Sequence, residues 1–358
     1  MLWETGIKVI DVYAPVALGG TVALLAQPGV GLMVLVHELI HRLAAQRGGC
    51  AVMTRLDHAR NPVTEVVGEL RESGVEQHTA LVVGRSEAAP AELRQALARA
   101  LAAAEDVVAR GRDVLLIVDD GFAIPETVDL LTGRARSAEH GSLTVLFCFW
   151  RHTTPQPTVA PEVVPLLGNA QTRLVFSREL ALQAIWPAID VLQSHSTLLD
   201  SAHVSDAHLR VAAAARALLR DGAQSPATVE QERAQKLLLF QAQPFFVAEP
   251  FTARPAECVP CNESVQAFQA ILDGDYDAIA SEPALSGGRH RRHSAEPSGS
   301  RCRRTEYGSG VDVRRGMRCS ACAAAHAPPR LRVVPQAQGE GSGNALGGIH
   351  REIRCREV

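Results

Sequence analysis

The regular alternation of short apolar runs with amphipathic stretches is the feature that most constrains the fold of this chain. Between Trp3 and about Ser205, apolar runs typical of β-strands are separated by segments with helical periodicity. The apolar runs are "TVALLA", "CAVMT", "TALVVG", "DVLLIVDD" and "SLTVLFCF", and the amphipathic stretches include "VLVHELIHRLAAQ" and "AELRQALARALAAAEDVVARG". This alternation predicts an α/β domain at 1–205 with a mostly parallel sheet covered by helices on both faces.

The pattern changes after residue 205. Three helical patterns follow, "LRVAAAARALLRD", "VEQERAQKLLLFQAQ" and "ESVQAFQAILDG", and they predict a small helical domain at 206–284. From residue 285 to 358 the chain is rich in Arg, Gly and Ser and has no periodicity. Such a segment lacks the apolar surface that would offset its ordering entropy, so we predict a disordered tail.

Composition excludes several classes of protein. With 358 residues, 46 % hydrophobic content and a net charge of −3, the chain can bury a full-sized core and is not a general nucleic-acid binder. It has no apolar run of about 18 residues and no signal-type segment after Met1. We therefore expect a cytoplasmic protein that does not span a membrane and whose eight cysteines are thiols.

The segment "LLAQPGVGLMVLVHELI", Leu24 to Ile40, has the layout of a phosphate-binding loop: a strand, a glycine-bearing turn and a helix. The consensus G-x-x-x-x-G-K-[ST] reads here as Ala26, four residues, Gly31, Leu32 and Met33. The turn is therefore kept, whereas the lysine and the hydroxyl that bind phosphate and magnesium are replaced.

Several further segments, in order, share one resemblance. They are "LWETGIKVIDVYAPVALGG", "PGVGLMVLVHELI", "DVLLIVDD", "TGRARSA", "IWPAIDVLQSHS", "QPFFVAEPFTA" and "FQAILDGDYD". Together they resemble the beta subunit of the rotary F-type ATP synthase, over roughly Trp3 to Ile279. The resemblance implies a RecA-like P-loop NTPase domain followed by a shortened C-terminal helical domain.

The same resemblance implies ATP or ADP and magnesium as ligands. Gly29, Val30 and Gly31 take the positions whose backbone N–H groups cradle the phosphates, and Leu32 and Met33 take those of the lysine and the threonine. Neither replacement supplies a charge or a hard oxygen. We therefore expect weak or absent nucleotide and magnesium binding.

Two positions correspond to catalytic and metal-ordering carboxylates. His58 takes the place of the catalytic glutamate, and a slip of one residue in the alignment would give that place to Asp57; the other interpretation of both is a solvated loop. Asp119, at the end of "LLIVD", matches the aspartate that orders magnesium through water. It alternatively forms a polar strand end at the edge where a ligand crevice opens.

Two aromatic residues match the adenine pocket of the family. Trp186 takes the position of the ring that stacks on adenine, and Phe251 matches a second pocket-lining ring. Both alternatively serve in the core or in an interface.

Three further patterns do not point to a site. The pairs Cys258/Cys261 and Cys319/Cys322 are too far apart for a zinc ribbon, so we expect no zinc. His37 and His41 have metal-pair spacing without a third ligand, and the basic run 289–293 is expected to be solvated.

The resemblance implies proton-coupled ATP synthesis or hydrolysis in a hexameric ring with alpha-type subunits at the membrane periphery. Because the catalytic positions are replaced, we hypothesise a pseudoenzyme. The alternatives are a structural or regulatory partner of an alpha subunit and a weak adenine-nucleotide sensor.

Overall fold

The centre of the molecule is a nine-stranded sheet, seen in a computed structural model that describes residues 1–57, 62–137, 141–150, 164–222, 229–278 and 333–334. The strand order is β10-β9-β3-β8-β6-β4-β5-β11, and β7 pairs with β8 at one end of that strand. The strands are β3 (Thr21–Ala26), β4 (Cys50–Asp57), β5 (Thr79–Arg85), β6 (Asp113–Asp119), β7 (Arg136–Ser137), β8 (Ser142–Trp150), β9 (Thr172–Val175), β10 (His195–Ser196) and β11 (Val333–Val334).

Most of the sheet is parallel. All pairings from β9 through β11 are parallel, and β10 and β7 add antiparallel pairings. The five apolar runs of the sequence form β3, β4, β5, β6 and β8. A separate two-stranded sheet pairs β1 (Leu2–Trp3) with β2 (Val16–Ala17).

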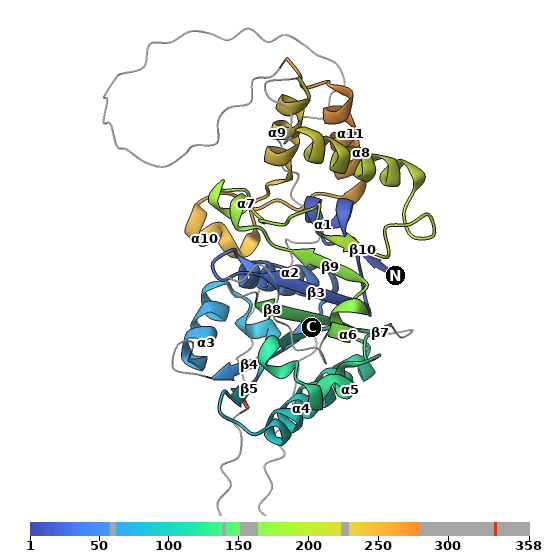
Figure 1. Ribbon diagram of the computed structural model, residues 1–358. Coiled ribbons are helices and arrows are strands. Elements are labelled where there is room, and N and C mark those ends of the chain that lie inside the picture. Colours follow the sequence, from blue (N-terminus) through green and yellow to red (C-terminus); the bar gives the residue numbers. More distant parts are fainter. Residues whose placement is uncertain (58–61, 138–140, 151–163, 223–228, 279–332, 335–358) are drawn as a thin grey trace, which may run out of the picture.

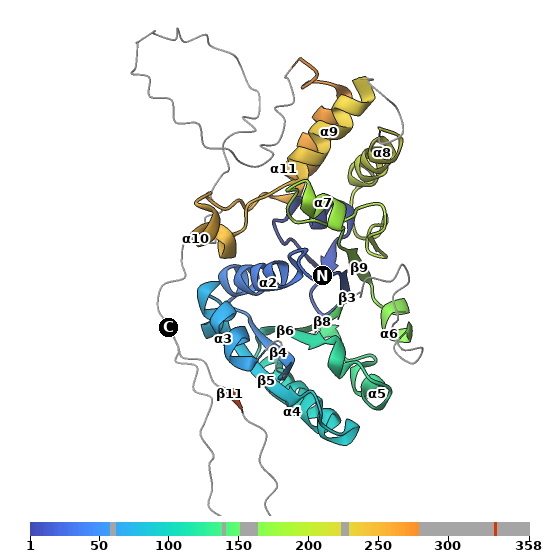
Figure 2. The ribbon, with the colours of Figure 1, turned by 60° about the vertical axis from the view of Figure 1, so that its left-hand side comes forward.

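Helices cover both faces of the sheet, as Figures 1 and 2 show. Alternate residues of β6 divide between two cores: Leu115 and Ile117 join the core on the α2 side, and Val114, Leu116 and Val118 join the core on the α4 side. This period of two is what a strand buried on both faces requires. The helices of this part are α1 (Lys8–Tyr13), α2 (Leu32–Arg47), α3 (Val63–Glu72), α4 (Pro90–Ala109), α5 (Val128–Leu131), α6 (Val164–Gly168) and α7 (Arg178–Leu182).

Three of the four C-terminal helices lie beyond α1, in the upper part of Figure 1, and the shortest of the four lies lower, near α2. They are α8 (Asp206–Gly222), α9 (Val229–Gln241), α10 (Glu249–Thr252) and α11 (Cys261–Asp273). Phe268 of α11 is fully buried, and its ring meets those of Tyr13 and Phe240 edge-on, with centroids 5.6 and 5.5 Å away. Helices α8, α9 and α11 share one apolar core with α2, so the boundary at residue 205 stays a prediction.

Two other predictions concern the C-terminal tail and the absence of a membrane-spanning helix. The tail predicted at 285–358 lies outside the described residues apart from Val333–Val334, which pair with β5. Within the described ranges, no helix combines the length and the apolar character needed to cross a membrane.

Candidate functional site

The turn between β3 and α2 has the backbone of a phosphate-binding loop. Gly29 and Gly31 both adopt a left-handed conformation with φ of 82°, which favours glycine because it has no Cβ. Gly31 caps α2, and the Leu35 N–H donates to its carbonyl at 3.1 Å. Between the two glycines the Val30 side chain is buried. The turn therefore keeps its shape through glycines and an apolar contact.

The first helical residues after this turn present no polar group. Leu32 is only 1 % exposed and belongs to the apolar core, and the half-buried Met33 packs against the same core. The position expected for a phosphate-binding ammonium is thus part of the hydrophobic packing of α2. Leu32 and Met33 therefore offer a phosphate no charged or hydroxyl group, and the first turn of α2 offers its backbone N–H groups.

Trp186 lies over this turn. A Cβ built on Gly31 would lie 2.8 Å from Cζ3 of the Trp186 indole, so the ring contacts the glycine face directly. The residue as a whole is 41 % exposed, and the Gln243 N–H donates to the Trp186 carbonyl at 2.8 Å. Phe251, on α10, is 66 % exposed. The structure therefore brings Trp186 to the loop, and the adenine-binding roles expected of Trp186 and Phe251 stay predictions.

Asp119 ends β6 in an ion pair with an arginine of the neighbouring strand. Arg55 Nη1 lies 2.5 Å from Asp119 Oδ2, and both side chains are only 10 % exposed. The other oxygen, Oδ1, accepts the Gly121 N–H at 3.2 Å, and the Asp119 N–H donates to Thr54 Oγ1 at 3.2 Å. Both carboxylate oxygens are therefore engaged within the protein.

Arg55 places a buried positive charge at the carboxyl edge of the sheet. Its Nε has no hydrogen-bond partner among the described residues. Burial, with the Arg55 charge second, lowers the pKa of His37 to about 4. Burial raises the pKa of the Glu69 carboxyl, and the Arg55 charge opposes that shift. The sequence analysis missed Arg55, although an arginine inside the otherwise apolar run "CAVMTRLD" was a visible signal.

The loop after β4 is described only in part. The exposed Asp57 accepts the Val63 N–H at 3.0 Å through Oδ1, so it satisfies a free donor at the start of α3. His58 lies outside the described residues. The structure thus gives Asp57 a local structural role, and the placement of His58 at the catalytic position stays a prediction.

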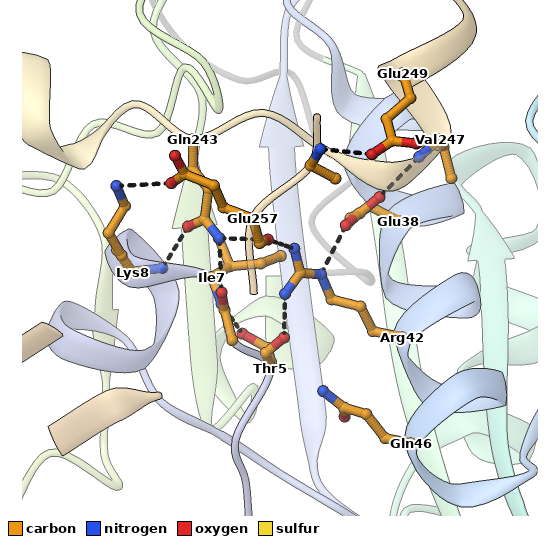
Figure 3. Close-up of polar contacts among 12 residues, drawn as sticks. Thr5, Ile7, Lys8, Glu38, Arg42, Gln46, Gln243, Val247, Glu249 and Glu257 are labelled. Carbon is orange, nitrogen blue, oxygen red and sulfur yellow. Dashed lines mark hydrogen bonds and ion pairs between the residues drawn. The ribbon is translucent and has the colours of Figure 1, made fainter. Parts of the chain in front are cut away.

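The helix that follows the loop is fixed by a buried ion pair, drawn in Figure 3. Arg42 Nε lies 2.7 Å from Glu38 Oε1, and neither side chain is exposed. The guanidinium also donates to the carbonyls of Thr5 and Glu257, each at 2.8 Å. Glu38 Oε2 accepts the Val247 N–H at 3.1 Å. One i,i+4 pair of α2 therefore holds both the N-terminal segment and the segment that carries α10.

A second set of contacts completes the same junction. Gln243 accepts the Lys8 N–H at 2.9 Å and donates from Nε2 to the carbonyls of Gly6 and Glu257, each at 2.8 Å (Figure 3). The Lys8 ammonium lies 3.4 Å from the Glu257 carboxylate, and burial lowers its pKa. These bonds place residues 243–257, and with them Trp186, relative to the loop.

Magnesium does not fit the side chains at this edge. It requires hard oxygen ligands, but Asp119 is paired with Arg55 and Met33 carries no oxygen. Among the residues that the structure describes, no group of three or more His, Cys, Asp or Glu is arranged to hold a metal ion. An arginine, Arg55, is therefore paired with the carboxylate at which a metal would be expected.

The remaining motifs do not form sites in the described part. His37 Nδ1 lies 2.9 Å from Ser73 Oγ, and the His41 ring stacks on Phe246 with centroids 5.0 Å apart. Cys258 is buried and Cys261 half-buried. Cys319, Cys322 and the run 289–293 lie outside the described residues, so the expectation of no zinc stays a prediction.

The fold and the loop define a class: an α/β nucleotide-binding fold of the phosphate-binding-loop type. Residues 6–138 match the model of the ATP synthase alpha/beta family, nucleotide-binding domain. Among solved structures, the chain is similar to an ATPase from the type III secretion system of pathogenic bacteria. That similarity has a TM-score of 0.57 and 21 % sequence identity, and covers 76 % of this chain and 85 % of that chain. The predicted α/β fold with a mostly parallel sheet is confirmed.

Proposed function

We propose that this chain is an ATP synthase beta-subunit-like protein that does not hydrolyse ATP and that binds adenine nucleotides weakly. The ion pair between Arg55 and Asp119 carries this proposal, because it occupies the carboxylate that would order magnesium. Burial of Leu32 supports it, since no ammonium reaches the phosphates. Loss of a charge-assisted contact costs about 1.5–3 kcal/mol, which is about 10- to 150-fold in affinity.

The adenine end of the site supports weak binding rather than none. Trp186 lies at the loop with 41 % of its surface exposed, and stacking requires only a flat ring. Backbone N–H groups at the start of α2 remain as phosphate donors. A site of this kind recognises the base more strongly than the phosphate chain, so AMP should bind nearly as well as ATP.

An ATPase assay on the full chain tests the catalytic part of the proposal. We expect no turnover above that of Asp119→Asn, purified identically so that contaminating ATPases are equal. Turnover that Asp119→Asn abolishes would contradict the proposal. Quenching of tryptophan fluorescence by ATP and AMP tests the binding part, with Trp186→Leu as the control that removes the proposed stacking ring. Affinities for ATP and AMP that differ more than about tenfold would show that the phosphates are recognised strongly.

A second candidate function rests on exposed apolar side chains of α7 and α10. Leu182 of α7 is 79 % exposed and Phe251 of α10 is 66 % exposed. Contiguous exposed apolar side chains mark protein interfaces, and we take these two residues as part of such a surface. They favour a structural partner of an alpha-type subunit in a ring at the membrane periphery. Co-expression with such a subunit tests this candidate, and Leu182→Glu should abolish co-purification.

A further inference from the structure

We infer that Arg55 takes the place of a divalent metal at Asp119, so that phosphate groups at this edge of the sheet bind to a guanidinium without metal. The inference deepens the proposed function and rests on the β3–α2 loop being the phosphate end of a nucleotide site. It concerns whether a guanidinium or a divalent metal binds the phosphate groups, whereas the proposed function concerns ATP turnover and adenine binding.

The first step is the geometry of the pair. Arg55 comes from β4 and Asp119 from β6, two adjacent parallel strands, and both residues lie at or near the carboxyl ends of those strands. Carboxyl ends of parallel strands open on the same edge as the β3–α2 turn. At 2.5 Å, with both side chains 10 % exposed, the guanidinium excludes a hydrated metal from Oδ2.

The second step is the unused capacity of Arg55. Arg55 is 8 % exposed, and its Nε has no hydrogen-bond partner among the described residues. A buried N–H donor without an acceptor is costly, and an anion oxygen would relieve that cost. Arginine also presents donors in a planar fork that matches phosphate oxygens.

The third step is the sign of the effect of Asp119. Where a carboxylate orders magnesium, its removal weakens metal-dependent phosphate binding. Where it pairs with Arg55, it competes with phosphate for the guanidinium, and its removal strengthens binding without metal. The two arrangements therefore predict opposite responses to Asp119→Asn.

Isothermal titration of the full chain with inorganic pyrophosphate in EDTA tests this. We expect Asp119→Asn to bind at least about tenfold more tightly than the unsubstituted chain, since one charge-assisted competitor is removed. Magnesium in place of EDTA should not tighten binding to either protein. The double variant Arg55→Gln, Asp119→Asn should lose the gain, because no guanidinium remains.

Asp113→Asn is the matched control. Asp113 begins the same strand and also pairs with an arginine, Arg47, at 2.5 Å, but at the opposite edge of the sheet. The two variants change net charge equally, so a general charge effect would act on both. We expect Asp113→Asn to leave pyrophosphate affinity unchanged.

Three results would overturn the inference: equal affinities for Asp119→Asn and Asp113→Asn, binding that needs magnesium, or no binding by either Asp119→Asn or the unsubstituted chain. Circular dichroism checks that Asp119→Asn is folded. If Asp119→Asn is not folded, pyrophosphate binding to the unsubstituted chain in EDTA and in magnesium still tests the inference, since binding that needs magnesium would overturn it. No readout here is catalytic, so ATP turnover would refute the proposed function while leaving the pyrophosphate result to be judged alone.

Discussion

Removal of the Arg42 side chain should destabilise the protein far more than removal of an exposed arginine that forms the same kind of i,i+4 ion pair. The Arg42→Met variant leaves the Glu38 carboxylate fully buried without its counter-ion, since the two side chains are 0 % exposed and 2.7 Å apart. It also removes the donors to the Thr5 and Glu257 carbonyls. Breaking one side of a buried pair costs about 3–5 kcal/mol, because an uncompensated charge remains.

The measurement is the free energy of unfolding by urea, with the m value checked so that the same transition is compared. Arg110→Met is the control, because Arg110 also pairs with an acid four residues earlier, Asp106, but both side chains are about half exposed. We expect a change within about 0.5 kcal/mol there. Adding Glu38→Gln to Arg42→Met should recover part of the loss, since no buried charge is then left. A loss for Arg42→Met below about 1 kcal/mol would refute the reasoning on burial.

Three further perturbations follow from the site. Gly31→Ala should destabilise the protein more than Gly29→Ala and should shift the tryptophan emission. Both glycines have φ of 82°, but only a Cβ on Gly31 would meet Trp186, at 2.8 Å. Equal effects of the two substitutions would contradict that contact. The pKa of His37, about 4, lies below its ordinary value, so the contribution of neutral His37 to stability is present above about pH 6.5 and is lost as pH falls toward 4. In His37→Gln, the free energy of unfolding by urea should therefore depend less on pH across that window. An unchanged pH dependence would count against the shift. Burial raises the pKa of the Cys261 thiol to about 12. Iodoacetamide at pH 8 should therefore label Cys261 much more slowly in the folded protein than in the urea-unfolded protein, as mass spectrometry would measure. Equal labelling rates would show that the thiol is accessible and ionisable in the folded protein.

The apolar patterns of the sequence were sufficient to predict the five longest strands and most of the long helices. The runs at β3 and β6 are short, apolar and bounded by polar residues, and each needs only its own residues to indicate a strand. The strand β9 was not predicted, because its four residues are too few for a clear period. The helix α3 was missed although Val63, Val66, Val67 and Leu70 have helical spacing. The substitutions Leu32 and Met33 were also visible in the sequence, because motif spacing is local.

The sequence by itself determined which side chains, Leu32 and Met33, stand at the lysine and hydroxyl positions of the loop consensus, since residue types at fixed spacing define those positions. Only the tertiary structure decided which charged groups meet at the carboxyl ends of the strands. Arg55 and Asp119 are 64 residues apart in the chain and meet through the order of parallel strands. Arg42 and Glu257 are separated by 215 residues and meet only when the C-terminal segment packs on α2. A charged residue in an apolar run is visible in a sequence, but its partner depends on the register of strands and the packing of helices, which local patterns do not specify.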